Sequence, residues 1–170
     1  MKFVAYLLLS LVLTLTLAIS AVGRDIHTGN AVARVTVVTE TTLSSANSTS
    51  FTDLPGGTVQ IMVPAGNPQL VQAGFSSESY CFATSDLAYQ YCLMQILADG
   101  KEMLPASHGG FVFDTNGQSD DAWEAHAMAR TIVLKPGPHV IRVQCAVSDP
   151  NLALALNNWT LTVTQYANGK

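Results

Sequence analysis

The sequence has few charged residues, no cluster of basic side chains and no catalytic signature of a known enzyme class. Charged residues make up 12% of the 170 residues, and the formal net charge is −4. Binding to nucleic acid or to an acidic membrane surface needs grouped Lys and Arg, so the sequence argues against both partners. The serine-hydrolase elbow, the paired histidines of zinc proteases and the phosphate-binding glycine loop are also absent.

Only one apolar run is long enough to approach a membrane span, and it lies at the N-terminus. Lys2 precedes an almost wholly apolar stretch at residues 3–17, and small residues follow at two candidate cleavage points, after Ser20 and after Gly23. This layout predicts a secretory signal peptide over residues 1–23. The alternative is an uncleaved anchor, since the run approaches the roughly 20 apolar residues of a span. Cleavage leaves seven basic and twelve acidic residues, a net charge of −5, on a secreted or cell-surface protein without a membrane segment.

Three cysteines leave one thiol unpaired in an oxidising compartment. Cys81 and Cys92 bracket a short polar excursion, and we expect a disulfide between them. Cys145 shares the parity of the apolar residues of its segment, which favours a buried and inert thiol. The alternative for Cys145, a reactive or intermolecular cysteine, lacks a neighbour that would lower its pKa.

Helical spacing is absent over any useful length, and alternation of apolar and polar residues dominates the chain after the N-terminal run. This is the pattern of half-buried strands. Turn signals separate the strands, among them Asp99-Gly100, whose residues tolerate the positive φ angles of a tight hairpin. Short strands without intervening helices predict an all-β, antiparallel two-sheet sandwich. The alternating stretches are residues 34–39, 58–63, 70–75, 92–98, 111–113, 123–134, 140–147 and 159–166.

Pro-rich linkers, internal repeats and a change of composition within the chain are also absent, so we predict one domain. Residues 24–56 should contribute an N-terminal strand and a flexible segment, and residues 57–170 the body of the sandwich. Residues 41–53, rich in Ser and Thr, are expected to form a mobile loop or a tether.

An Asx-rich stretch at residues 114–121 is the first candidate site. Oxygen side chains around a glycine can surround a hard cation, and we name Asp114, Asn116, Asp120 and Asp121 as calcium ligands. The EF-hand pattern is not met. The alternative is a solvated turn between two strands, which such residues form without an ion.

The next strand carries the second candidate site. If residues 123–134 form a strand, Glu124, His126 and Arg130 project to one face, with Trp123 on the other. These three side chains could hold an anionic or sugar ligand or perform acid–base chemistry. The alternative is a solvent-exposed strand face tied by cross-strand pairs.

Tyrosines on both sides of the expected disulfide form the third candidate. Tyr80 and Tyr89 could offer flat rings on which a sugar stacks, with Tyr91 beside them.

Several of these segments resemble uncharacterised secreted bacterial β-sandwich proteins. The resemblance covers residues 57–166 and rests on Tyr80-Cys81, the run Trp123-Glu124-x-His126-x-x-x-Arg130, and the closing residues 158–163. The end of the chain also resembles jelly-roll modules of the tumour necrosis factor and carbohydrate-binding types. That second resemblance implies a jelly-roll architecture and no particular function.

Together these features predict a secreted, non-enzymatic module that binds an extracellular ligand, a glycan or another cell-surface component. The alternative is a subunit of an extracellular filament or surface layer, in which strand 31–41 adds to a neighbouring sheet. A hydrolase that uses Glu124 or an aspartate of the 114–121 loop is a third reading, and no motif supports it. No cofactor is expected beyond a structural calcium ion, and the partner is an extracellular ligand or another copy of the chain.

Overall fold

The fold was obtained as a computed structural model, which describes residues 27–83, 90–107, 109–117 and 122–167. The expected signal peptide lies outside these residues. No helix long and apolar enough to cross a membrane occurs in the part of the chain that is described. The described chain is all-β, and its strands are β1 (Val32–Glu40), β2 (Ser44–Ala46), β3 (Thr52–Val63), β4 (Gln69–Ala83), β5 (Gln90–Ala98), β6 (Lys101–Glu102), β7 (Phe111–Asn116), β8 (Glu124–Leu134), β9 (Gly137–Val147) and β10 (Leu152–Tyr166).

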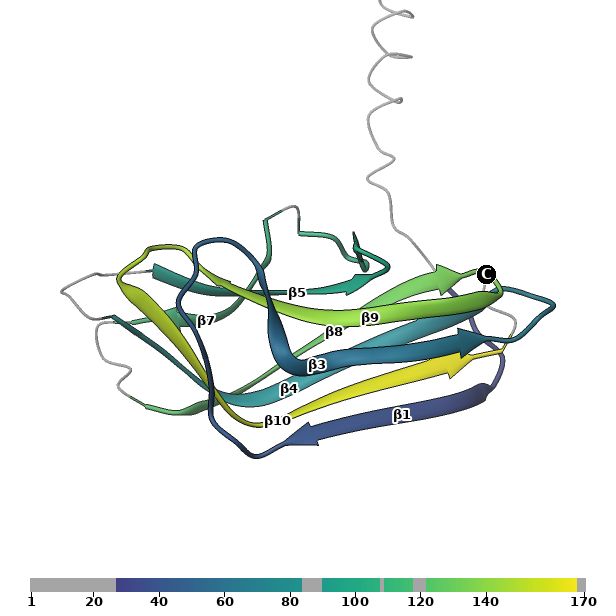
Figure 1. The fold of residues 1–170 in the computed structure, drawn as a ribbon, viewed down its shortest axis with the longest axis horizontal. Coiled ribbons are helices and arrows are strands. Elements are labelled where there is room, and N and C mark those ends of the chain that lie inside the picture. Colours follow the sequence, from purple (N-terminus) through teal and green to yellow (C-terminus); the bar gives the residue numbers. More distant parts are fainter. Residues whose placement is uncertain (1–26, 84–89, 108, 118–121, 168–170) are drawn as a thin grey trace, which may run out of the picture.

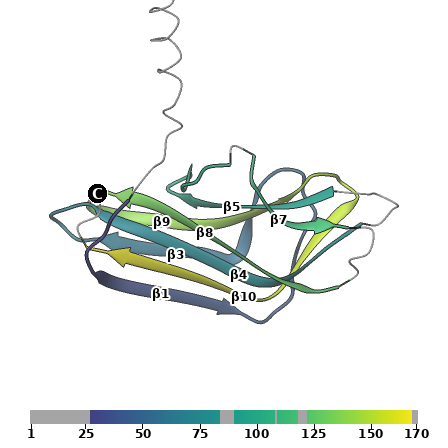
Figure 2. The same ribbon diagram turned by 180° about the vertical axis from the view of Figure 1, so that it is seen from behind.

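Two antiparallel sheets pack face to face, as Figures 1 and 2 show from opposite sides. Sheet A has the order β1-β10-β4-β8, with β2 also on β10, and sheet B has the order β3-β9-β5, with β6 and β7 on β5. The pairing is nested: β1 with β10, β3 with β9, β4 with β8, and β5 with β7. A ribbon of strands folded over in this way is a jelly-roll, so the expected sandwich and its architecture are both confirmed.

The core lies between the inner faces of the two sheets. Over much of β4 and β10 buried residues alternate with more exposed ones, because successive side chains of a strand point to opposite faces. Trp159 is 1% exposed, and its ring centroid lies 5.9 Å from that of Phe75. Phe75 in turn contacts Phe113 of sheet B at 5.7 Å. These aromatic contacts help to hold the two sheets together.

The disulfide between Cys81 and Cys92 is confirmed, and it joins β4 of sheet A to β5 of sheet B. Both cysteines are buried. Cys145 is free and buried, as the sequence predicts, and burial raises the pKa of its thiol to about 12. At that pKa the thiolate is scarce at neutral pH, which makes the group unreactive.

The segment at residues 41–53 differs from the expected mobile loop. Ser44–Ala46 form the strand β2, which pairs with Leu154–Leu156 of β10, and β3 already begins at Thr52. Polar Ser- and Thr-rich sequence can form strands because the backbone supplies the hydrogen bonds and the neighbouring strand supplies the apolar surface.

The N-terminal strand β1 lies in its own sheet. It pairs with β10 from Val32 to Glu40 and forms one edge of sheet A. Addition of this strand to the sheet of a neighbouring copy, the mechanism that the sequence suggested for a filament, stays a prediction.

Candidate functional site

The polar residues of β8 lie on one face, as predicted, but that face is not the solvated one. Met128 and Arg130 are buried and His126 is half-buried, whereas Trp123 and the alanines between these positions are exposed. The reading of a solvent-exposed strand face tied by cross-strand pairs is therefore wrong for Arg130 and in part for His126. Alternation alone could not decide which face is inner, because the other face consists of small alanines.

Arg130 is separated from the rest of its predicted group. Its side chain is 5% exposed, its guanidinium lies 4.7 Å from the centre of the Phe111 ring, and Nη1 donates to the Ala129 carbonyl at 2.9 Å. Burial lowers the pKa of Arg130, and the charge of Glu102 raises it by a smaller amount. Met128 lies between Arg130 and His126 on the same face, so the sandwich does not bring Arg130 to a site with Glu124 and His126.

Glu124 and His126 instead meet Asp114 from the first candidate site. His126 Nε2 lies 3.4 Å from Glu124 Oε2, and His126 Nδ1 lies 3.9 Å from Asp114 Oδ2. Asp114 can reach inward because β7 contains a bulge, at which Cys92 pairs with Asp114 and Leu93 with Val112. The extra residue, Phe113, and Asp114 are both buried as a result.

Ser79 links these side chains and was missed in the sequence. Its hydroxyl lies 2.7 Å from Asp114 Oδ2 and 2.8 Å from His126 Nδ1. Only the register of β4 against β8, in which Ser79 is opposite Glu124, brings Ser79 to this group. A serine, a histidine and a carboxylate in contact could suggest nucleophilic catalysis, but Ser79 is 0% exposed. A substrate cannot reach its oxygen in this conformation.

The calcium ligands remain a prediction. Asp114 is buried and its carboxylate accepts hydrogen bonds from Ser79 and from the Thr115 amide. Asn116 lies at the end of β7, and Asp120 and Asp121 fall outside the described residues.

An aromatic cluster lies on the outer face of sheet A, at the end that carries the disulfide. The ring centroid of Tyr80 lies 5.1 Å from that of Phe82, nearly parallel to it, and 5.9 Å from that of Trp123. Trp123 is 48% exposed. We call Tyr80, Phe82 and Trp123 the aromatic platform. It includes one tyrosine of the predicted pair, while Tyr89 lies outside the described residues.

A group of polar side chains lies next to the platform on the same face. Asn157 Nδ2 and Asn158 Nδ2 donate to Glu78 Oε2 at 3.2 and 2.9 Å. We call Glu78, Asn157 and Asn158 the polar cluster. Glu78 is two residues from Tyr80 on β4, a spacing of about 7 Å along a strand.

A bulge in β10 explains how two consecutive asparagines reach one carboxylate. The register of β10 against β4 shifts between Asn157 and Thr160, and Asn158 has a φ of 49°. Asparagine tolerates this left-handed conformation better than most residues. The bulge aims Asn158 at Glu78 while the next residue, Trp159, enters the core.

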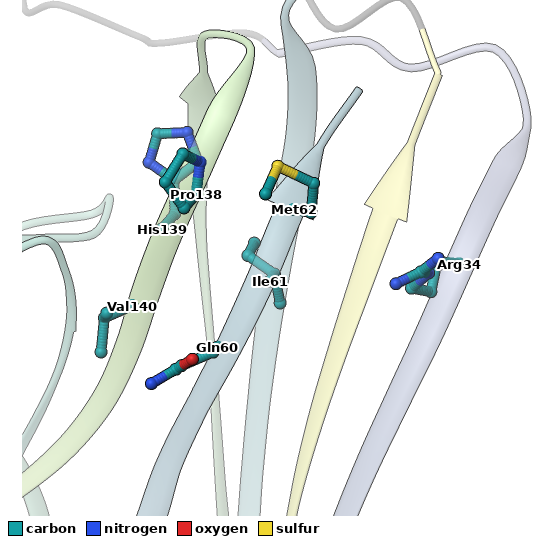
Figure 3. A pocket seen from close by; sticks show the side chains of 7 residues that line it. All are labelled: Arg34, Gln60, Ile61, Met62, Pro138, His139 and Val140. Atoms are coloured by element: carbon teal, nitrogen blue, oxygen red, sulfur yellow. The ribbon is translucent and has the colours of Figure 1, made fainter. Parts of the chain in front are cut away.

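The hollows on the described surface include one over β4, β8 and β10 and one beside β1, β3 and β9. The first, of about 320 Å³, lies beside the platform and is lined by Glu78, Asn158 and the predicted site residue His126, together with Ser76, Ser77, Ala125 and Ala127. The other, of about 470 Å³, is lined by Arg34 of β1 and residues of β3 and β9, including Met62 and Pro138 (Figure 3). None of the residues predicted as ligands from the sequence lines the second hollow.

No protein-family model matches the chain, and no curated protein matches it. Among solved structures, it is similar to dimeric latent PorU from Porphyromonas gingivalis, at 13% identity and a TM-score of 0.40, over 82% of this chain and 14% of that one. It is also similar to the sugar-binding C-terminal domain of EclA, at 10% identity and a TM-score of 0.32, over 84% and 86% of the chains. A third similar structure is Eiger TNF from S. frugiperda, at 9% identity and a TM-score of 0.30, over 74% of this chain and 92% of that one. Scores of this size carry no conclusion about function.

Proposed function

We propose that this protein is a secreted, non-enzymatic module that binds a glycan on the outer face of sheet A. The observation that carries the proposal is the aromatic platform beside the polar cluster, with a hollow of about 320 Å³ between their strands. The buried disulfide supports export, because such bonds persist in oxidising compartments.

The two halves of this surface match the two kinds of surface on a sugar. The C–H face of a pyranose packs on a flat ring, and Tyr and Trp suit a site with one apolar side and one wet side. The hydroxyls at the sugar edge need fixed donors and acceptors, which a carboxylate and two amides provide. Because Asn157 and Asn158 hold Glu78 Oε2, the carboxylate is already oriented, which reduces the entropy lost on binding.

The charge of the hollow favours a neutral or basic glycan over an acidic one. Glu78 is the acidic residue that lines it, His126 is the lining residue that can become positively charged, and no Lys or Arg is among the lining residues. Sialylated or sulfated sugars would place an anion beside this carboxylate without a Lys or Arg to compensate the charge.

A glycan array with the mature protein, followed by calorimetry on the best ligand, tests the proposal. We expect Trp123→Ala and Glu78→Gln each to weaken binding by about tenfold or more, because each removes one of the two contacts. Tyr91→Ala is the matched control, since Tyr91 is 45% exposed on sheet B. Trp123 is half-exposed, so its truncation should leave the fold intact by circular dichroism. An array without a hit, or equal binding by all three variants, would refute the proposal.

A second candidate function is self-association through β1, and its exposed valines favour it. Val32, Val35 and Val37 are all more than half exposed. In its own sheet β1 is an edge strand and pairs with β10. An apolar edge strand of nine residues can pair with a second chain. Two β1 strands related by a two-fold axis at Val37 would place Arg34 of each copy opposite Glu40 of the other.

Cross-linking at single positions tests this register. Val37→Cys should form a covalent dimer with a short thiol cross-linker, because position 37 faces itself across the axis. Val35→Cys is the control, since its two copies would be about 13 Å apart along the strands. The charge pairing is tested separately: Arg34→Glu and Glu40→Arg should each weaken the dimer, and the double variant should restore it. Monomer at all accessible concentrations would exclude this function.

A further inference from the structure

The cluster of Asp114, Glu124 and His126 is open to solvent at one end and buried at the other. Each residue offers one ligand atom, and these atoms lie within 4.8 Å of one another. Glu124 and His126 are 48% and 29% exposed, whereas Asp114 is 8% exposed. An ion from solution can therefore reach the Glu124 side of the imidazole.

Ser79 decides which nitrogen of His126 carries the proton. A hydroxyl has one hydrogen to donate, and a carboxylate can only accept. Ser79 Oγ must therefore donate to Asp114 Oδ2, at 2.7 Å, and accept from His126 Nδ1, at 2.8 Å. In the neutral imidazole, the other nitrogen, Nε2, then has a free lone pair.

That lone pair faces another acceptor. His126 Nε2 and Glu124 Oε2 are 3.4 Å apart, and neither has a hydrogen to share in this tautomer. A cation between them removes the conflict. With Zn–N and Zn–O distances of about 2.0 to 2.2 Å and a tetrahedral angle, two ligand atoms on one zinc ion are separated by about 3.3 to 3.5 Å. The observed separation of 3.4 Å lies within this range.

We propose that His126 Nε2 and Glu124 bind Zn²⁺ or a similar late first-row divalent ion. Water or a ligand atom fills the remaining positions. Asp114 acts through Ser79 as a positioning residue, since a metal-bound histidine commonly donates its second ring N–H to a fixed acceptor. The imidazole ligand separates this site from the calcium site expected at residues 114–121, because calcium takes six to eight oxygen ligands. The proposal does not depend on glycan binding.

Calorimetric titration of the chelator-treated mature protein with ZnCl₂ at neutral pH tests the site. We expect one ion per chain and a loss of affinity of about tenfold or more in His126→Gln and Glu124→Gln. Asp53→Asn, which changes an exposed carboxylate on β3 of sheet B, should leave the affinity unchanged. Ser79→Ala should weaken binding while leaving both ligands in place. In the NMR spectrum of the imidazole, Zn²⁺ should shift Nε2 and leave Nδ1 protonated.

Three results would overturn the proposal. The first is the absence of zinc binding in the wild type. The second is equal affinity in His126→Gln, which would place the ion elsewhere. The third is an imidazole protonated on both nitrogens at neutral pH and unaffected by Zn²⁺, which would make the Glu124 contact an ion pair.

Discussion

Reduction of the Cys81–Cys92 disulfide should destabilise the protein by about 3 kcal/mol. The bond closes a loop with a sequence separation of 11 residues. On the chain-entropy model such a loop removes about 9 cal/mol/K from the unfolded state, which is about 2.8 kcal/mol at 25 °C. For a domain of this size, the melting temperature should fall by about 6 to 12 °C. Cys81→Ala/Cys92→Ala should be less stable again, because it also leaves space at two buried positions.

Urea denaturation followed by tryptophan fluorescence measures these differences, since Trp159 is buried in the folded state. Comparing the oxidised wild type, the reduced wild type and the double variant separates the loop entropy from the lost packing. Cys145→Ala controls for effects of the reductant on the free thiol. Equal midpoints for the oxidised and reduced wild type would refute the reasoning. Because Cys81 lies between Tyr80 and Phe82, the reduced protein should also bind glycan more weakly.

Three further predictions concern single residues. Partial burial lowers the pKa of His139, but its hydrogen bonds with Asp99 and the Lys135 carbonyl outweigh this, so the pKa is raised above 6.5. The stabilisation is therefore complete below that pH and is lost as the pH rises through the folded-state value. In Asp99→Asn, the loss of unfolding free energy with rising pH should be smaller by about 0.5 kcal/mol, as measured by urea denaturation at several pH values. The same pH dependence in the variant and the wild type would contradict this prediction. Cys145 should resist a thiol reagent at pH of about 8 until the protein unfolds, because burial raises its pKa to about 12; rapid native labelling would show that the site opens. Asn158→Ala should cost about 1 kcal/mol more than Asn158→Gly, since glycine adopts the positive φ freely; equal denaturation midpoints would argue against the bulge geometry.

Much of the fold follows from local pattern. Asp99 and Gly100 have the positive φ angles, 52° and 81°, that their turn chemistry predicts. The parity of Cys145 with its apolar neighbours placed it in the core correctly. These inferences succeed because alternation and turn chemistry depend on neighbouring residues along the chain.

The site depended more on long-range geometry. The alternation in the sequence placed Trp123 and Glu124 on opposite faces of the strand, yet it could not show that Trp123 faces solvent and contacts the ring of Tyr80. Glu78 and Asn158 are 80 residues apart and had no local signal. In the sequence Ser79 is one of several serines in a polar stretch, and only the pairing of β4 with β8 places it beside His126.

By itself, the sequence determined the class of the fold, the disulfide and the positions of most strands, because hydrophobic periodicity and cysteine spacing depend on residues that are close together along the chain. Only the tertiary structure decided which face of β8 is inner, that Arg130 is separated from His126, and that Asp114 reaches Glu124 and His126. The physical reason is register: strand pairing and the two bulges, in β7 and β10, set which distant side chains meet, and a one-residue change in either would turn those side chains to the opposite face.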